Sequence, residues 1–429
     1  MLGNMAAGRP VLIIGGGVGG LVLGHALKNK AIPFRIFERD PILDFRPQGY
    51  RFHLPPKGTE ALFACLNPET TEKLKQSSPQ YRGPGGEGLA CNLRNGEPDE
   101  ELLKLAPKIQ GGHKPFNVDR GSLRKALSED LPVEFGKAFD SFTIEKDSVN
   151  VKFQDGTTAA GSLLVGADGL RSRIRAALLP EYQLLDTEGR WLWGKSDLTP
   201  ALRAKLEQSQ SGRLVMTGIL GGQDREASDE GVPVSLIAES IVFDRLAENP
   251  RRDILPSDYI YWVLQFSKRT LNMDDSEFLK LDADGAAHLV RDFTQEWIPE
   301  LQAVFEHATP GYTAAQAVTS GDPAVPAYDG KGRVTLLGDA IHQMPPTAGQ
   351  GASAAIQDAR WLAEALAEGG VTQECLSKYE EKMRQNGAQA IASSEFKSAK
   401  MYGAPPFARM RRFKPDQNLG QESNTAELL

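Results

Sequence analysis

Glycines and carboxylates that follow apolar stretches are the residues of this chain whose spacing points most directly to chemistry. Gly15-x-Gly17-x-x-Gly20 comes straight after the apolar stretch 11–14, and the acid Glu38 follows about 20 residues later. Gly15 permits a tight turn, Gly17 lacks the Cβ that would keep a pyrophosphate from the backbone, and Gly20 lets a helix lie close to a strand. A helix that begins here offers free N–H groups and the positive end of its dipole to phosphates. The pattern therefore predicts a dinucleotide site.

The acid of this pattern indicates which dinucleotide the turn favours. Glu38 ends a second predicted strand, 33–38, where a carboxylate accepts hydrogen bonds from the ribose hydroxyls of an adenosine. Because a carboxylate repels a 2′-phosphate, the fixed nucleotide is expected to be FAD or NAD rather than NADP. Arg39 is the counter-argument, since an arginine can accept that phosphate. The alternative is a glycine turn in some other α/β fold, with Glu38 as a solvated strand end.

Two further apolar stretches end close to an aspartate. The stretch 162–166 precedes Asp168, and the stretch 332–338 precedes Asp339. Ligands of parallel sheets bind at the carboxyl ends of the strands, so these residues are expected to meet on one extended cofactor. Each aspartate has a plainer alternative, which is to cap the helix that follows it.

The elements that must position these residues follow from periodicity and from glycine and proline breaks. Segment 186–319 contains four of the five tryptophans and predicts an antiparallel sheet on which a flat organic molecule could lie. Trp193 and Tyr261 are candidates for a substrate platform, although aromatic residues on a sheet face are more often core. A loop is expected at 221–229 and another at 340–351. The expected strands of this sheet are 212–220, 232–243 and 259–267, and the expected helices of the chain are 58–66, 121–131, 284–305, 351–368 and 373–400.

Composition and charge exclude several classes of function. The 429 residues carry a net charge of −7, with no basic surface of the kind that binds nucleic acid. The three cysteines are far apart and no Cys/His cluster has metal-ligand spacing, so neither a disulfide framework nor a metal site is expected. The uncharged segment 11–27 contains six glycines and is short for a bilayer, so we expect a soluble, cytoplasmic protein without a membrane partner.

The chain resembles the single-component FAD monooxygenases of the p-hydroxybenzoate hydroxylase type from residue 11 to about residue 368. Three motifs stand in the order of that family, and an arginine, Arg120, matches its helix-start arginine. Ser353 departs from the pattern, because many relatives carry Asn there, which puts in doubt the support of the flavin ring but not the class. The motifs are Gly15-x-Gly17-x-x-Gly20 with Glu38, Val165-Gly-Ala-Asp168-Gly-Leu-Arg-Ser172, and Gly338-Asp-Ala-Ile-His342-Gln-Met-Pro-Pro346-Thr-Ala-Gly-Gln-Gly351-Ala-Ser353.

The resemblance implies a role for each matching residue of the cofactor site. Glu38 is expected to hold the AMP ribose, Arg120 to neutralise the pyrophosphate or bond the ribityl chain, and Asp339 to accept a ribityl hydroxyl. Gly351 and Ala352 begin a helix whose N–H groups face flavin N1 and O2, where negative charge collects on reduction.

Other residues have less defined roles. Asp168 is expected near both the FAD and the path of NAD(P)H, and either Arg46 or Arg51 is expected to add a phosphate contact. Met344 and Pro345 are expected to line the flavin edge, with turn rigidity as the plainer reading. A lone histidine in a loop, His342 here, is more often structural than catalytic. We assign no catalytic side chain, because the flavin carries the chemistry.

The family also implies an α/β architecture and an activity. A doubly wound FAD-binding domain is expected from segments 9–76, 115–185 and 323–400, the last of which includes C-terminal helices. The segment 77–114 is expected as a substrate-side excursion, 186–322 as an inserted antiparallel-sheet substrate domain, and 401–429 as a tail.

The implied enzyme binds FAD non-covalently, takes electrons from transient NADPH or NADH, and transfers one oxygen from a C4a-hydroperoxyflavin to an aromatic or polycyclic small molecule. Hydroxylation and epoxidation are both compatible with this chemistry, and similar chains occur in natural-product pathways. Three alternatives stay open: an FAD oxidase or dehydrogenase that releases peroxide, a flavin- or NAD-binding protein without catalysis, and a membrane-associated epoxidase, which the lack of a hydrophobic tail disfavours.

Overall fold

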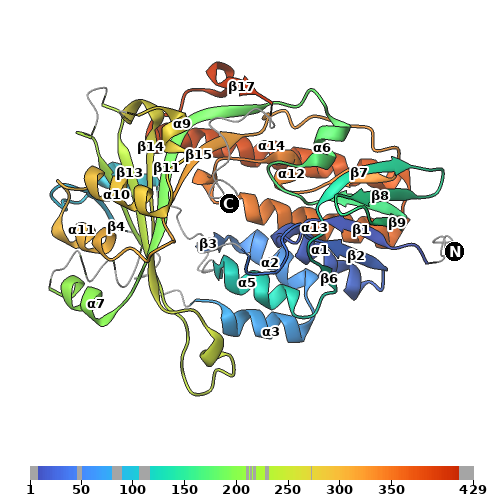
Figure 1. Cartoon of the computed structure of the whole chain (residues 1–429), viewed down its shortest axis with the longest axis horizontal. Helices are drawn as coiled ribbons and strands as arrows, with labels where there is room; N and C mark the ends of the chain where they lie inside the picture. Colours follow the sequence, from blue (N-terminus) through green and yellow to red (C-terminus); the bar gives the residue numbers. More distant parts are fainter. Residues whose placement is uncertain are drawn as a thin grey trace.

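Two sheets lie side by side in the computed structural model of the chain (Figure 1). The structure describes residues 8–45, 51–79, 89–105, 116–208, 219–227, 231–271 and 273–414, with Gly212 and Val215 between them. The smaller sheet is parallel and the larger is mainly antiparallel. The predicted α/β fold class is confirmed, whereas the exact domain boundaries remain a prediction.

The parallel sheet is assembled from distant parts of the chain. Its five strands have the order β16-β10-β1-β2-β6, and Val11 of β1 lies between Leu163 of β10 and Phe34 of β2. Every residue of β1 and β10 is buried, as expected for a parallel sheet that is covered on both faces. The strands are β1 Val11–Ile14, β2 Phe34–Phe37, β6 Val133–Glu134, β10 Leu163–Gly166 and β16 Val334–Leu336.

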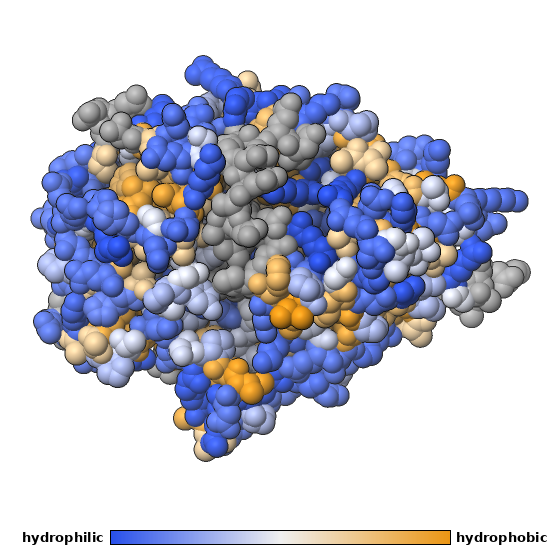
Figure 2. Space-filling view, in the orientation of Figure 1, coloured by the Kyte–Doolittle hydropathy of each residue, from blue (hydrophilic) through white to orange (hydrophobic). Residues whose placement is uncertain are grey.

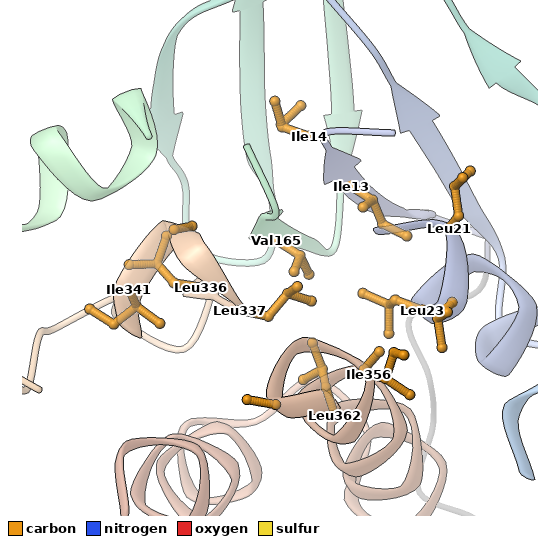
Figure 3. Packing of buried hydrophobic residues seen from close by; sticks show 14 of the residues in the cluster. Ile13, Ile14, Leu21, Leu23, Val165, Leu336, Leu337, Ile341, Ile356 and Leu362 are labelled. Atoms are coloured by element: carbon orange, nitrogen blue, oxygen red, sulfur yellow. The ribbon is translucent and has the colours of Figure 1, made fainter. Parts of the chain in front are cut away.

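Helices cover one face of the parallel sheet. A small antiparallel sheet packs against the parallel sheet as well. Figure 3 shows Ile13 and Val165 pointing from the sheet toward Ile356 of a long helix, α13. Phe153 of the small sheet contacts Phe37 at 4.7 Å between ring centroids. The elements of this half are α1 Val18–Asn29, α2 Pro56–Cys65, α3 Pro68–Ser77, α5 Arg120–Ser128, α6 Arg173–Leu178, α12 Asp339–His342, α13 Gly351–Gly369, α14 Gln373–Tyr402, β7 Phe139–Ile144, β8 Val149–Phe153 and β9 Thr158–Gly161.

The large sheet separates two apolar layers. Its strand order is β15-β11-β14-β13-β12-β4, and β17 pairs with β11. Side chains alternate along β14, so that Tyr261 belongs to the core shared with the parallel sheet while Trp262 packs under the outer helices. The strands are β4 Leu89–Asn92, β11 Leu184–Asp197, β12 Ile219–Asp224, β13 Val234–Ile241, β14 Tyr259–Ser267, β15 Ala314–Ser320 and β17 Arg411–Phe413, and the outer helices are α7 Pro200–Leu206, α9 Asp275–Phe278, α10 Ala283–Phe293 and α11 Pro299–Glu306.

Several connections join the two halves. The ribbon of β3 (Arg51–Leu54) and β5 (Phe116–Asp119) lies between the sheets (Figure 1). The end of α14 reaches the large sheet, where the hydroxyl of Ser235 donates to the Met401 carbonyl oxygen at 2.5 Å. The segment 77–114 contributes β4 to the large sheet and a short helix, α4 (Glu100–Leu105), so the chain crosses between the halves here.

Several expected elements differ in the structure. The first residues of the predicted loop 221–229 belong to the strand β12. Gly222 lies in this strand because a Cβ at this position would overlap the side chain of Leu93, and not because the chain turns there. The predicted strand 212–220 is shorter, since Gly212 and Val215 are helical. The predicted helix 284–305 is two helices, because Pro299 starts a new one.

Further differences lie at the C-terminal side. The expected loop 340–351 contains the short helix α12, and the expected tail pairs with the large sheet through β17. The face of the molecule in Figure 2 is mostly hydrophilic, with apolar side chains in small groups. Among the described helices, none is long and apolar enough to span a bilayer.

Candidate active site

The three motif glycines have different surroundings. A Cβ at Gly15, whose φ is +114°, would overlap the carbonyl oxygen of Ala167, and a Cβ at Gly20 would overlap that of Gly15. A Cβ at Gly17 would meet nothing within 4 Å. Two glycines are therefore needed by the fold itself, whereas Gly17 opens into space next to the start of α1. This is the arrangement that the approach of a pyrophosphate requires.

Glu38 lies against the glycine turn at the end of β2. Its Oε2 accepts the Gly16 N–H at 2.8 Å and its Oε1 accepts the Asp40 N–H at 3.1 Å. A carboxylate has about four acceptor positions, so acceptor capacity remains for ribose hydroxyls. Arg39, next to it, is exposed. The assignment of Glu38 and Arg39 to the nucleotide stays a prediction.

A buried arginine that sequence reasoning missed lies behind this turn. Arg124 of α5 donates from Nε to the Gly16 carbonyl oxygen at 3.2 Å, and its Nη2 is 3.8 Å from Oε2 of Glu38. Burial lowers the pKa of Arg124, although the charge of Glu38 opposes this shift. The sequence signal that could have identified Arg124 is its spacing of one helical turn from Arg120, which places both side chains on one side of α5.

Asp168 caps the start of α6, as the plainer of its two predicted roles requires. Its Oδ2 accepts the N–H groups of Arg173 at 2.9 Å and of Ile174 at 3.5 Å, at the start of α6. Its Oδ1 is buried and has no hydrogen-bond partner among the described residues. Burial raises the pKa of Asp168. One oxygen therefore supports the fold, and a cofactor-binding role for Asp168 stays a prediction.

Asp339 stands at the start of α12 with its carboxylate accessible to solvent. A Cβ at Gly351 would lie 3.9 Å from its Oδ1, so the two motif residues are neighbours. The surrounding protein raises the pKa of Asp339, while the positive charges of His342, Arg120 and Arg175 act in the opposite direction. Asp339 and Gly351 are thus neighbours, and the charge of Arg120 acts on the Asp339 carboxylate.

The helix that begins at this point is α13. Gly351 and Ala352 are its first two residues, so their N–H groups have no partner within the helix. The positive end of the helix dipole therefore faces the same region as Asp339.

A buried ion pair fixes the geometry behind Asp339. His342 of α12 and Asp358 of α13 have fully buried side chains, and Nε2 of His342 is 2.6 Å from Oδ2 of Asp358. The same oxygen accepts the N–H of Gly338 at 3.0 Å. Burial alone would lower the pKa of His342, but the neighbouring carboxylate of Asp358 raises it. The geometry of His342 is that of a structural residue, because its ion pair with Asp358 stabilises the turn that precedes Asp339.

The candidate substrate residues lie on the inner face of the large sheet and on the loop after α12. Trp193 is 4% exposed and Tyr261 is 9% exposed, both within the core shared by the two halves. Met344 and Pro345 are buried, whereas Pro346 is exposed. Of this loop, Pro346 is therefore better placed than Pro345 to touch a ligand.

Arg51 of β3 contacts the large sheet, and its expected phosphate contact stays a prediction. It forms an ion pair with Glu239 of β13, and its guanidinium lies 5.2 Å from the centroid of the Tyr261 ring. His53 places Nε2 3.0 Å from the same carboxylate. Arg46, the other candidate, lies outside the described residues.

Burial and charge act in opposite directions on this cluster. Burial alone would raise the pKa of Glu239, but the charges of Arg51 and His53 hold it below its usual value. Sequence reasoning missed this cluster, because nothing in the local pattern of β3 or β13 indicates that the two strands meet.

A second link joins the ribbon to the sheet. The hydroxyl of Tyr259 donates to Oδ2 of Asp119 at 2.7 Å, and Oδ1 of Asp119 caps α5 by accepting the Ser122 N–H at 2.8 Å. Arg120 follows Asp119 directly in the chain. The hydrogen bond between Tyr259 and Asp119 therefore links the inner face of the large sheet to the cofactor side.

Together these groups fit an elongated anionic dinucleotide with a planar head. The open space at Gly17 suits phosphates, the accessible carboxylate of Asp339 suits a hydroxyl group, and the start of α13 suits a ring that gains negative charge.

Comparison with known proteins indicates that this dinucleotide is FAD. Residues 300–394 match the family described as FAD binding domain. The chain is 32% identical over 417 residues to the dual O-methyltransferase/FAD-dependent monooxygenase CTB3 of Cercospora beticola, and the match covers 93% of this chain and 47% of that protein. The chain therefore spans about half the length of the curated relatives that it matches first.

Solved structures share the fold over nearly the whole chain. A protein from Photorhabdus luminescens, assigned as an FAD-containing monooxygenase, matches with a TM-score of 0.74 and 26% identity, covering 91% of this chain and 98% of that one. HpxO of Klebsiella pneumoniae, solved with FAD and uric acid, matches with a TM-score of 0.68 and 22% identity, covering 93% and 90%.

Proposed function

Because the chain belongs to the FAD-dependent monooxygenases, we propose that it uses NADPH or NADH and O2 to insert one oxygen atom into an aromatic or polycyclic small molecule. FAD is its cofactor, held without a covalent bond. The observation that carries this proposal is that Asp339 and Gly351 are neighbours, that the charge of Arg120 acts on the Asp339 carboxylate, and that Trp193 and Tyr261 belong to the core shared by the two halves.

The chain's own residues hold the cofactor and shield the reaction. Glu38 and Gly17 receive the AMP portion, Arg120 the phosphates or the ribityl chain, and Asp339 a ribityl hydroxyl. The first N–H groups of α13, from Gly351 onward, stabilise negative charge on the ring. When bound, FAD supplies the electron transfer and the activation of oxygen. The sheet face of tryptophan and tyrosine excludes water from the reacting atoms.

The substrate class is supported by the sheet face and by the relatives. The inner face offers aromatic side chains over which a flat ring can lie. Several relatives are named FAD-dependent monooxygenases of fungi, and a role in natural-product metabolism agrees with these names. We place the protein in the cytoplasm, in agreement with three free cysteines that are all buried.

The test is the visible spectrum of the purified protein with added FAD, followed by NADPH or NADH under anaerobic conditions. Bound flavin whose bands bleach on addition of the nucleotide is the expected result. Readmission of oxygen with candidate aromatic compounds should then give an oxygenated product in stoichiometry with the nucleotide consumed. Stoichiometric peroxide without product for every compound would favour an oxidase, and the absence of flavin binding would overturn the proposal.

A further inference from the structure

A charged row crosses the inner face of the large sheet next to an apolar one. Lys195 of β11 pairs with Tyr261 of β14, which in turn pairs with Glu239 of β13. The neighbouring row contains Trp193 and Val263. Since residues two apart on a strand face the same side, Lys195 projects toward the side of Trp193 and the cofactor half.

Aromatic rings surround the Lys195 ammonium group. Its Nζ lies 4.1 Å from the centroid of the Tyr312 ring and 4.8 Å from that of Tyr259. The residue is half-buried, and this burial lowers the pKa of Lys195, while the charges of Asp119 and Asp197 oppose the shift.

No carboxylate of the described residues lies within ion-pair distance of this ammonium group. Asp119 is the nearest acid of the cofactor half that acts on it, and both of its oxygens are already used, by the Tyr259 hydroxyl and by the Ser122 N–H. Lys195 therefore carries a charge that the faces of two rings contact directly, while Asp119 and Asp197 act on it only from beyond ion-pair distance.

Other buried cations of the molecule are treated differently. Arg190 pairs with Asp186 and Asp275, and Arg175 donates to three backbone carbonyl oxygens. Arg51 pairs with Glu239. Withdrawing a charge from water is costly unless a partner replaces the water. The partner that Lys195 lacks within the fold is expected to arrive with a ligand.

We propose that Lys195 is a specificity-determining residue that binds an anionic oxygen, a phenolate or a carboxylate, of the planar aromatic substrate. The inference rests on the proposed function in one respect, namely that the inner sheet face receives the substrate. With the substrate ring against the inner sheet face beside Trp193, an acidic oxygen at the edge of the ring is expected to meet the ammonium group. The site thereby favours the ionised form of the substrate over a neutral analogue of equal shape.

The experiment uses the FAD-loaded protein and three probes of similar size. The probes are 4-nitrophenol above its own pKa, 4-nitrobenzoate, and the neutral 4-nitroanisole, and equilibrium dialysis measures their affinities. We expect the wild-type protein to bind at least one anion roughly tenfold more tightly than the ether, as one favourable charge contact would give. Which anion binds more tightly distinguishes a phenolate from a carboxylate.

Variants connect this preference to the residue. Lys195→Met keeps the length of the side chain and should abolish the preference with less than about a twofold change for 4-nitroanisole, whereas Lys195→Arg should retain most of it. Lys152→Met is the matched control, because Lys152 is 60% exposed on β8. It should bind all three probes as the wild type does.

Two results would overturn the inference. One is a wild-type protein without preference for either anion, and the other is a Lys195→Met protein that keeps it. Flavin absorbance of each variant separates this failure from that of the proposed function: a Lys195→Met protein with full FAD content and an unchanged preference contradicts only the role of Lys195.

Discussion

At the scale of single residues, the glycine turn separates what the fold needs from what the cofactor needs. Gly15 and Gly20 lie against backbone carbonyl oxygens, whereas the Cα of Gly17 faces open space. A substitution at Gly15 or Gly20 should therefore reduce the stability of the fold, whereas one at Gly17 should reduce the affinity for FAD. Stability and affinity can be measured independently.

We predict that Gly17→Ala folds normally and loses FAD. The added methyl group meets no protein atom, so the unfolding free energy of the apoprotein should change by less than about 1 kcal/mol. The affinity for FAD, measured by quenching of flavin fluorescence, should fall at least about tenfold because the methyl group occupies the phosphate approach. Gly15→Ala is the matched variant and should lose about 2–3 kcal/mol of stability, since a residue with a side chain rarely adopts φ +114°. Normal FAD affinity in Gly17→Ala would contradict this division.

Asp339 is predicted to act on FAD with little effect on the fold. Its carboxylate is accessible and accepts no hydrogen bond that the described structure shows, so its removal breaks no internal contact. A charged hydrogen bond contributes about 1.5–3 kcal/mol, so Asp339→Ala should weaken FAD binding by about 10- to 100-fold. Asp339→Asn keeps an acceptor oxygen and should lose less. Asp253→Asn, at a side chain that is 86% exposed, serves as the control. A variant that retains FAD as tightly as the wild type would remove Asp339 from the site.

At the scale of elements, the joint between α12 and α13 depends on the pair of His342 and Asp358. Because Asp358 raises the pKa of His342, the pair contributes its full stability below the unfolded pKa of about 6.5, and this contribution is lost as the pH rises through the folded value. His342→Gln should therefore reduce the unfolding free energy by about 3–5 kcal/mol near pH 6, and by less at higher pH, in urea titrations.

A second histidine offers a control for this joint. His288 is 71% exposed and lies 3.4 Å from Asp292 within one helix. His288→Gln should cost less than about 0.5 kcal/mol at every pH. If the difference between wild type and His342→Gln stayed constant or grew with pH, the sign of the assigned shift would be wrong.

Local patterns predicted the elements that build the cofactor side. The apolar stretches that end at Gly15, Asp168 and Asp339 each became a parallel strand, because a buried strand followed by a glycine turn is a signal contained within about ten residues. The loop predicted at 221–229 was wrong at residues 221–224, which belong to β12, since glycine usually marks a turn and here accommodates the neighbouring Leu93.

Contacts between distant elements had no such signal. The ion pair of Arg51 with Glu239 and the hydrogen bond of Tyr259 with Asp119 join strands that are not sequence neighbours. Polar residues on these strands carry no period that reveals their partner. Sequence reasoning therefore considered Arg51, with Arg46, only as a phosphate contact, and Lys195 went unnoticed.

At the scale of the whole molecule, polar contacts connect the cofactor half to the large sheet. Besides Arg51 with Glu239, an exposed loop of the sheet half reaches across, where Arg251 lies 2.6 Å from Glu129 and Asn249 donates to the Gln76 carbonyl oxygen at 3.0 Å. Glu239 is the most buried charged residue of this set and should dominate, since its charge has the least access to water.

We predict that Glu239→Gln loosens the contact between the two halves. It leaves Arg51 and His53 without their anion in a buried place, which should cost about 3 kcal/mol or more of unfolding free energy near pH 7. Hydrogen exchange should speed up in β3 and β13 before it does in β1, because those strands carry the contact. The pKa of Glu239 is held low by Arg51 and His53 against the effect of burial, so its contribution is present above about pH 4.3 and is lost as the pH falls through the folded value.

The control for this prediction is Glu306→Gln, which removes one member of an exposed pair. Glu306 and Lys205 are 3.1 Å apart with side chains that are 53% and 49% exposed, so the loss should stay below about 1 kcal/mol. Equal effects of the two variants would mean that burial of Glu239 adds nothing to its role. A large loss for Glu239→Gln with unchanged exchange in β3 would place the effect inside the large sheet rather than at its contact with the cofactor half. A faster exchange confined to β3 and β13 would instead show that this one carboxylate sets how firmly the substrate face is held against the flavin side.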